Sequence, residues 1–266
     1  MSDTRALLQP LINTALRAGG AIMAVYGTDF SVRDKADASP VTEADEAAEK
    51  IILADLAQLA PDVPVVAEES VAAGRVPAIV GAAAKQRFFL VDPLDGTREF
   101  VSHRDEFTVN IALIQAGEPI LGIVYAPARH ELYWGDVVGG EAGQLDGDPD
   151  GTMPSKGTTI RARHAPAEGL TVVASRSHRT PETDTFLAKY PVTEFRSIGS
   201  SLKFCLVARG EADIYPRLGT TMEWDTAAGQ AVLAAAGGRV TGLDGEPFIY
   251  GKPGFRNGHF VAWGRS

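Results

Sequence analysis

The 266-residue sequence lacks features that several classes of protein require. It has a single cysteine, Cys205, so it cannot form an internal disulfide, and nothing in it calls for an oxidising compartment. It has no uninterrupted apolar run long enough for a membrane span, and its mean hydropathy is −0.02. The stretch from Met1 to Arg5 lacks the basic start and apolar core of a signal peptide. We therefore expect a soluble, cytoplasmic protein with no transmembrane segment.

Basic residues are too few for a surface that binds nucleic acid. Lys and Arg number 25 against 34 Asp and Glu, a formal net charge of −9. Duplex DNA and RNA are bound mainly through basic contacts to phosphates, so we expect no duplex nucleic acid as a partner. A small anionic substrate remains compatible with this charge, because carboxylates can hold Mg²⁺ and the metal then presents positive charge.

Apolar spacing in the first half of the chain predicts two helices and several strands. The first helix is expected to end near Gly27, and the second to start after an N-cap at Thr42 and to stop at Pro61. The polar stretch 33–40 between them is expected to be a loop. Strand-like runs occupy 63–66, 88–91, 107–114 and 120–125, and the last two are expected to form a hairpin.

A segment rich in Gly, Asp and Pro at 139–157 has no periodicity and predicts a boundary between two lobes. Beyond it, strand-like runs at 170–174 and 213–215 alternate with helical runs at 181–189, 200–208 and 225–236. This alternation predicts α/β layering. We expect an α+β lobe over residues 1–155 and an α/β lobe over residues 156–266. Cys205, Trp134 and Trp224 are expected to be core or packing residues.

Acidic residues follow the ends of predicted strands, where α/β proteins build their sites. The segment Asp92-Pro93-Leu94-Asp95-Gly96-Thr97 comes directly after the apolar run 88–91. Proline restricts one backbone angle and glycine permits a tight turn, so the two aspartates can point to one place. A plain polar turn is the simpler interpretation of this segment.

Two further acidic positions add to this pattern. Glu68 and Glu69 follow the run 63–66, and Asp225 precedes an apolar helix. A solvated loop would account for the glutamates, and ordinary N-capping would account for Asp225. Together with Asp92 and Asp95, however, Glu68 and Asp225 would supply the oxygen ligands that Mg²⁺ prefers. Phosphate hydrolysis gains from two such metals, which bridge the attacking water and the leaving oxygen.

The combination of motifs resembles a known family over essentially the whole chain. Glu68-Glu69-Ser70, the Asp92–Thr97 segment and Trp224-Asp225-Thr226-Ala227-Ala228-Gly229 resemble the lithium-sensitive inositol monophosphatase superfamily of Mg²⁺-dependent phosphatases. Within it, the chain is most similar to the CysQ-type 3′(2′),5′-bisphosphate nucleotidases of bacteria. This finer similarity lies in the segments 97–100, 175–178, 199–208 and 215–217. Inositol phosphatases usually continue the acidic turn with Thr-Asn-Phe, so Arg98-Glu99 favours the nucleotidases, which more often carry Lys at position 98.

The resemblance implies a layered α/β/α/β/α sandwich, two or three Mg²⁺ ions and a set of site residues. The implied metal ligands are Glu68, Asp92, the backbone carbonyl of Leu94, Asp95 and Asp225. Asp45, Thr97 and Glu68 are the implied catalytic residues. A threonine hydroxyl can accept a hydrogen bond from the attacking water only if its own proton is committed elsewhere, and a nearby Asp45 carboxylate would be a suitable acceptor.

The resemblance also implies the substrate-binding residues, which are Glu68, Leu94, Asp95, Gly96, Thr97, Ser177, His178, Gly199, Lys203, Arg217 and Asp225. Outside the matched motif His178 would be an ordinary surface histidine, and Arg217 could be a structural arginine. Lys35 could approach a metal or the phosphate, or lie solvated in its loop. Ser200 or Ser201 could cap the helix that starts there, with amides suited to a phosphate.

The implied reaction removes the 3′-phosphate of adenosine 3′,5′-bisphosphate, giving AMP and phosphate, and 3′-phosphoadenylyl sulfate is a further expected substrate. The role would be by-product clearance in sulfur assimilation. The alternatives are inositol monophosphatase or fructose-1,6-bisphosphatase activity, or a non-catalytic metal-binding protein, which would not need Asp45 and Thr97. We expect a monomer or homodimer in the cytoplasm. Some relatives are peripheral to the inner membrane, but no basic amphipathic helix supports that location here.

Overall fold

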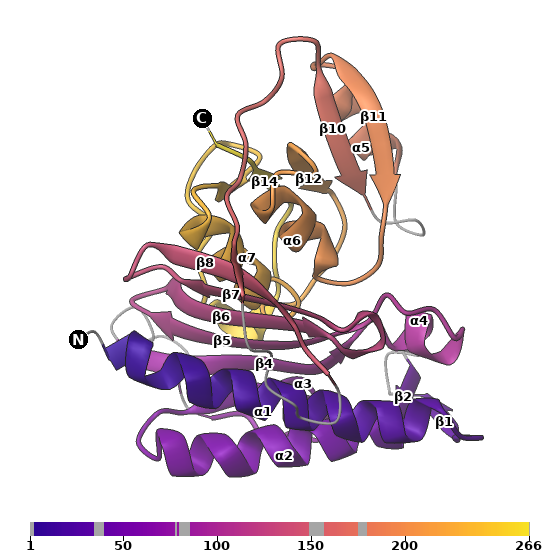
Figure 1. The fold of residues 1–266 in the computed structure, drawn as a ribbon, viewed down its shortest axis with the longest axis vertical. Helices are drawn as coiled ribbons and strands as arrows, with labels where there is room; N and C mark the ends of the chain where they lie inside the picture. The colour runs from indigo at the N-terminus through magenta and orange to yellow at the C-terminus, as the bar shows by residue number, and fades with distance from the viewer. Residues whose placement is uncertain are drawn as a thin grey trace.

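A computed structural model describes residues 3–34, 40–77, 79, 86–148, 157–174 and 180–265. Their helices and strands form five alternating layers: a helix pair, a seven-stranded sheet, a second helix pair, a five-stranded sheet and an outer helix (Figure 1). The layered α/β/α/β/α sandwich is therefore confirmed. No helix in the described part of the chain is long and apolar enough to cross a membrane.

The first layer consists of α1 (Asp3–Tyr26) and α2 (Glu43–Leu59), which cover one face of the large sheet. α2 starts after Thr42, as expected, because a capping box forms there. The Asp45 carboxylate accepts a hydrogen bond from the Thr42 backbone N–H at 2.8 Å. The stripe of Ala44, Ala48, Ile52 and Leu56 is fully buried against the sheet, as an amphipathic helix requires.

The seven-stranded sheet has the order β3-β4-β5-β6-β7-β8-β9. Only β3 and β4 pair in parallel; the other neighbours are antiparallel. Its strands are β3 (Val65–Ala67), β4 (Arg87–Asp95), β5 (Thr108–Gln115), β6 (Glu118–Ala126), β7 (Glu131–Asp136), β8 (Glu141–Asp146) and β9 (Thr158–Thr159). Short helices follow β3, β4 and β6: α3 (Glu68–Ala72), α4 (Thr97–Val101) and the 3₁₀ helix η2 (Pro127–Arg129).

One strand lies in the segment expected to be a lobe boundary, and one loop expectation is wrong. The segment 139–157 contains β8, whose sequence Glu-Ala-Gly-Gln-Leu-Asp has weak strand propensity and is held by its pairing with β7. The stretch 33–40 contains parts of β1 (Val32–Asp34) and β2 (Pro40–Thr42), which pair antiparallel. In both places the strand depends on a partner strand, which the local sequence does not reveal.

The middle layer consists of α6 (Leu202–Ala208) and α7 (Ala227–Ala235), between the two sheets. α7 lies very close to the large sheet. A Cβ atom at Gly122 of β6 would lie 2.5 Å from the Ala228 carbonyl oxygen, and one at Gly135 of β7 would lie 2.6 Å from that of Ala231. These glycines let the helix approach, and the approach places Asp225, just before α7, over the sheet. Cys205 and Trp224 are buried in this core, as expected.

The five-stranded sheet has the order β11-β10-β12-β14-β13. β10 is parallel to β11 and β12, and β14 is antiparallel to β12 and β13. Its strands are β10 (Leu170–Ala174), β11 (Val192–Ser197), β12 (Ile214–Arg217), β13 (Arg239–Gly242) and β14 (Phe260–Trp263), with η3 (Pro253–Phe255) before β14. α5 (Pro181–Leu187) forms the outer layer and packs on this sheet through Leu187.

Candidate active site

The end of β4 carries two aspartates on one side of the sheet. Asp92 pairs with Asn110 of β5 and Asp95 pairs with Thr108, so three residues on β4 span two on β5. Side chains three apart on a regular strand face opposite ways, but this bulge restores a common side. Gly96 follows in the left-handed region at φ 93° and starts α4. The expected tight turn is therefore present.

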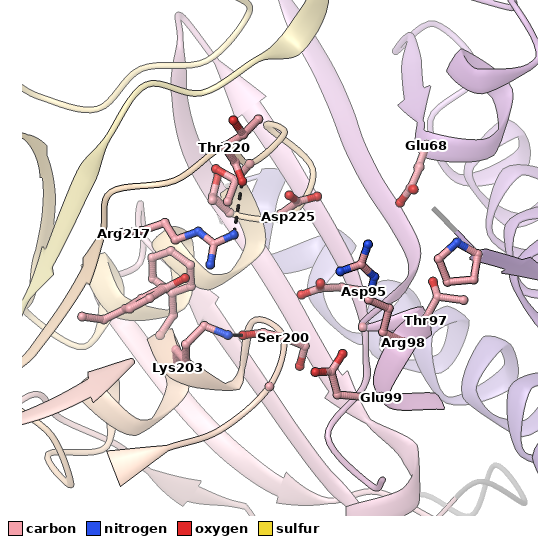
Figure 2. A pocket seen from close by; sticks show the side chains of 17 residues that line it. Glu68, Asp95, Thr97, Arg98, Glu99, Ser200, Lys203, Arg217, Thr220 and Asp225 are labelled. Carbon is pink, nitrogen blue, oxygen red and sulfur yellow. Dashed lines mark hydrogen bonds between the residues drawn. The ribbon is translucent and has the colours of Figure 1, made fainter. Parts of the chain in front are cut away.

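A cavity of about 320 Å³ opens beside this turn, between the two sheets (Figure 2). Eight of the expected site residues line it: Glu68, Asp95, Gly96, Thr97, Gly199, Lys203, Arg217 and Asp225. Figure 2 shows the cations Lys203 and Arg217 across the cavity from Glu68 and Thr97. The cavity thus has an acidic wall, formed by Glu68 and Asp95 beside the large sheet and by Asp225 before α7, and a basic wall formed by Lys203 of α6 and Arg217 of β12.

Thr97 and Asp45 are brought together although they are 52 residues apart in sequence. The Thr97 hydroxyl lies 3.2 Å from Asp45 Oδ1 and also 3.2 Å from the Leu94 carbonyl oxygen. The other Asp45 oxygen, Oδ2, accepts from the Thr42 hydroxyl at 2.7 Å as well as from its N–H. The capping box of α2 therefore holds Asp45 in place. Either the Asp45 carboxylate or the Leu94 carbonyl can accept a hydrogen bond from the Thr97 hydroxyl.

Asp225 does not cap α7. The N-cap position belongs to Thr226, and Asp225 Oδ2 instead accepts from the Met222 N–H at 2.8 Å. Burial raises the pKa of Asp225 well above the usual value, and the nearby carboxylates of Asp95 and Glu68 raise it further. Burial also raises the pKa of Asp95, although Lys203 partly opposes this shift. The positive charge near Asp95 and Asp225 is therefore too small to offset the burial and mutual repulsion of their carboxylates.

These residues fit a hard divalent cation by their chemistry. The donors are carboxylate oxygens, which suit Mg²⁺, and a cation would relieve their mutual repulsion. Among the residues that the structure describes, however, no three acidic, histidine or cysteine side chains gather closely enough to hold one ion together. Mg²⁺ usually keeps waters and substrate phosphate as further ligands, which such an open arrangement would require.

Three expected residues lie outside the cavity lining. Asp45, Asp92 and Leu94 are at most 2% exposed and lie in the walls behind it. Asp92 Oδ1 accepts from the Leu94 N–H at 3.0 Å, which shapes the turn. Ser177 and His178 lie outside the described residues, as does Lys35.

The basic wall is held by its own contacts. Lys203 is 5% exposed and its ammonium donates to the carbonyl oxygens of Ser200 and Ile198. Burial lowers the pKa of Lys203 to about 8, against the opposing effect of Asp95. Arg217 donates from Nη2 to the Thr220 carbonyl at 3.2 Å. Lys203 therefore shapes the turn at 198–200, and Arg217 shapes the turn after β12.

The capping role expected for Ser200 or Ser201 is wrong. Ser201 occupies the N-cap position of α6, but its side chain makes no capping hydrogen bond and contacts Asp95 and the Asp225 carbonyl instead. Thr220 and Thr221 also line the cavity. No sequence signal pointed to these threonines, because the turn after β12 carries no motif and approaches the site only through tertiary packing.

The cavity thus brings acidic side chains at strand ends opposite basic side chains from α6 and β12. A model of the inositol monophosphatase family matches residues 3–263. The chain belongs to this family, whose members are metal-dependent and generally use Mg²⁺.

Individual relatives refine the comparison. The chain is 45% identical over 258 residues to the 3′(2′),5′-bisphosphate nucleotidase CysQ of Escherichia coli K12, covering 94% of this chain and 98% of that protein. It is 32% identical over 261 residues to CysQ of Haemophilus influenzae, covering 97% and 93%. The crystal structure of CysQ from Bacteroides thetaiotaomicron, at 37% identity, superposes with a TM-score of 0.79 and covers 97% of each chain.

Proposed function

We propose that this chain is a 3′(2′),5′-bisphosphate nucleotidase that uses Mg²⁺ to hydrolyse adenosine 3′,5′-bisphosphate to AMP and phosphate. The contact between Thr97 and Asp45 beside the acidic wall is the observation that carries the proposal, because it supplies a hydroxyl able to orient water. The similarity to CysQ nucleotidases over most of the chain supports the choice of substrate. A pure metal-binding protein would have no use for this pair.

In this proposal Glu68, Asp92, the Leu94 carbonyl, Asp95 and Asp225 hold two or three Mg²⁺ ions. When bound, these ions would activate water and offset the charge that develops on the phosphate. Thr97 donates a hydrogen bond to Asp45 and accepts a hydrogen bond from the attacking water through a lone pair. The water oxygen bonds to phosphorus and gives up one proton to the solvent, the bond from phosphorus to the 3′-oxygen breaks, and the 3′-oxygen takes up one proton from the solvent, so that one water is consumed per phosphate released.

The basic wall is proposed to bind the part of the substrate that stays intact. Arg217 can pair with the retained 5′-phosphate through two parallel N–H groups. Lys203 adds positive charge beside it, and Gly199, Ser177 and His178 are proposed to contact the nucleoside. A sulfate group joined to the retained 5′-phosphate would also be tolerated, so 3′-phosphoadenylyl sulfate is a further proposed substrate.

The proposal includes the cellular setting and the lobes. By-product clearance in sulfur assimilation, in the cytoplasm and as a monomer or homodimer, remains the proposed role. The lobes are proposed as residues 1–155 and 156–266, with the substrate between the acidic and basic walls.

A phosphate-release assay tests this function. Adenosine 3′,5′-bisphosphate, inositol 1-phosphate and fructose 1,6-bisphosphate would be compared at equal concentration, with Mg²⁺ and with EDTA. We expect the largest kcat/KM for adenosine 3′,5′-bisphosphate and no phosphate release from any substrate in EDTA. A preference for inositol 1-phosphate or fructose 1,6-bisphosphate would instead indicate inositol monophosphatase or fructose-1,6-bisphosphatase activity. No release from any of the three would favour a non-catalytic metal-binding protein.

A further inference from the structure

Ser201 lies at the point where the two acidic segments of the site meet. Ser201 directly precedes α6 and is only 2% exposed. Its hydroxyl oxygen lies 2.7 Å from the Asp225 carbonyl oxygen and 3.0 Å from Asp95 Oδ2. Asn110 of β5 donates to the same hydroxyl oxygen from Nδ2 at 2.9 Å. One side chain thus joins the end of β4, the neighbouring strand β5 and the turn before α7.

These contacts use the hydroxyl proton and one of the two lone pairs of the hydroxyl oxygen. A serine hydroxyl has one proton and two lone pairs. It accepts from Asn110 and can donate to the Asp225 carbonyl or to Asp95, both of which lie within hydrogen-bond distance. Asn110 Nδ2 also lies 3.4 Å from Asp95 Oδ2. The hydroxyl is therefore directed toward Asn110, Asp95 and the Asp225 carbonyl, and it makes no capping hydrogen bond to α6.

The network leaves each aspartate with one oxygen tied and one available. Asp95 Oδ2 contacts Ser201 and Asn110, and Asp225 Oδ2 accepts from the Met222 N–H. The Oδ1 atoms of both aspartates take no part in these side-chain and Met222 contacts. Carboxylates that ligate metals are arranged in this way, with the protein holding one oxygen so that the other meets the ion.

We propose that Ser201 is a positioning residue that sets the distance between the Asp95 and Asp225 carboxylates for Mg²⁺. The Ser201 hydroxyl contacts the carboxylate of Asp95 directly, and it contacts Asp225 at the backbone carbonyl oxygen. This inference rests on the proposed function, because it assigns both aspartates to the metal. Asn110 supports Ser201 from a strand that carries no ligand of its own.

The test measures Mg²⁺ binding to the purified full chain by titration calorimetry, alongside thermal unfolding in EDTA. Ser201→Ala should raise the Mg²⁺ dissociation constant about 10–100-fold, the usual effect of losing a side chain that orients a metal ligand. Ser201→Thr keeps the hydroxyl and should restore tight binding. Ser197→Ala removes the same atom from an exposed position at the end of β11 and should bind like the wild type. Saturating Mg²⁺ should return most of the turnover of Ser201→Ala.

Several results would overturn the inference. Wild-type Mg²⁺ affinity in Ser201→Ala would do so, as would an equal loss in Ser201→Thr. Failure of Ser201→Ala to unfold cooperatively in EDTA would assign the hydroxyl to the fold. The wild type and Asp95→Asn separate this inference from the proposed function. Absence of Mg²⁺ binding by the wild type would defeat both, whereas binding that is lost in Asp95→Asn but kept in Ser201→Ala would defeat the inference alone.

Discussion

Replacing Thr97 with alanine removes the water-orienting hydroxyl and leaves the acidic wall in place. Thr97 Oγ1 lies 3.2 Å from Asp45 Oδ1, but the other oxygen of Asp45 is held independently by Thr42 at 2.7 and 2.8 Å. Asp45 should therefore keep its position when the hydroxyl is gone. The methyl group that remains at position 97 cannot accept a hydrogen bond from water.

The expected effect falls on the chemical step. Assistance by a positioned proton acceptor is worth about 10²–10⁴-fold in rate, or about 3–5 kcal/mol of activation free energy. The free energy of unfolding should change far less, because one hydroxyl hydrogen bond contributes about 0.5–1.5 kcal/mol. In a chain of this size that corresponds to a Tm lower by roughly 1–6 °C.

Steady-state kinetics with a Mg²⁺ titration separates these effects. For Thr97→Ala, kcat on adenosine 3′,5′-bisphosphate should fall by at least about 100-fold, while the Mg²⁺ concentration for half-maximal residual activity stays near that of the wild type. Thr97→Ser retains the hydroxyl and serves as the control, with most of the turnover kept. A large shift in the Mg²⁺ concentration for half-maximal activity would indicate that Thr97 acts mainly as a metal ligand. Near-normal kcat would refute the water-orienting role altogether.

Three further predictions address the acidic wall, the basic wall and α3. In EDTA, the pKa values of Asp225 and Asp95 are higher in the folded protein than the pKa of about 4 that an aspartate has in an unfolded chain. Above about pH 4 the folded protein therefore binds more protons than the unfolded chain, so the free energy of unfolding should fall as the pH rises above about 4. Calorimetry should find Asp225→Asn more stable than the wild type in EDTA at pH 7 and less sensitive to pH; a less stable variant would contradict this. Arg217→Ala should lower kcat/KM for adenosine 3′,5′-bisphosphate roughly 10–100-fold, because a charge-assisted contact is worth about 1.5–3 kcal/mol, and should leave 3′-AMP hydrolysis nearly unchanged. Equal losses on both substrates would assign Arg217 to the cleaved phosphate or to the fold. The buried Glu49 carboxylate accepts from the Glu69 N–H at 2.9 Å and the Ser70 hydroxyl at 2.7 Å, so Glu49→Gln should loosen the start of α3 and raise the Mg²⁺ requirement through Glu68. An unchanged Mg²⁺ titration would show that α3 is held without it.

Local pattern was sufficient for the elements that carry their own signal. α2 could be predicted from its N-cap at Thr42 and its apolar stripe, and the turn at 92–97 from its proline, glycine and paired acids. These features work within a few residues of each other, so the local sequence contains the relevant physics. β8 could not be predicted, because its strand state depends on pairing with β7 rather than on its own residues.

The site shows the same division. The sequence by itself determined which chemical groups are present: acids at strand ends, a hydroxyl in the turn and cations in the second half of the chain. Only the tertiary structure decided which of them meet. Ser201 could cap a helix or contact Asp95, 106 residues away, and the second outcome depends on where α6 and α7 pack. Close packing of α7 on Gly122 and Gly135 sets that position, since contacts between distant segments are chosen by the packing of whole layers rather than by neighbouring residues.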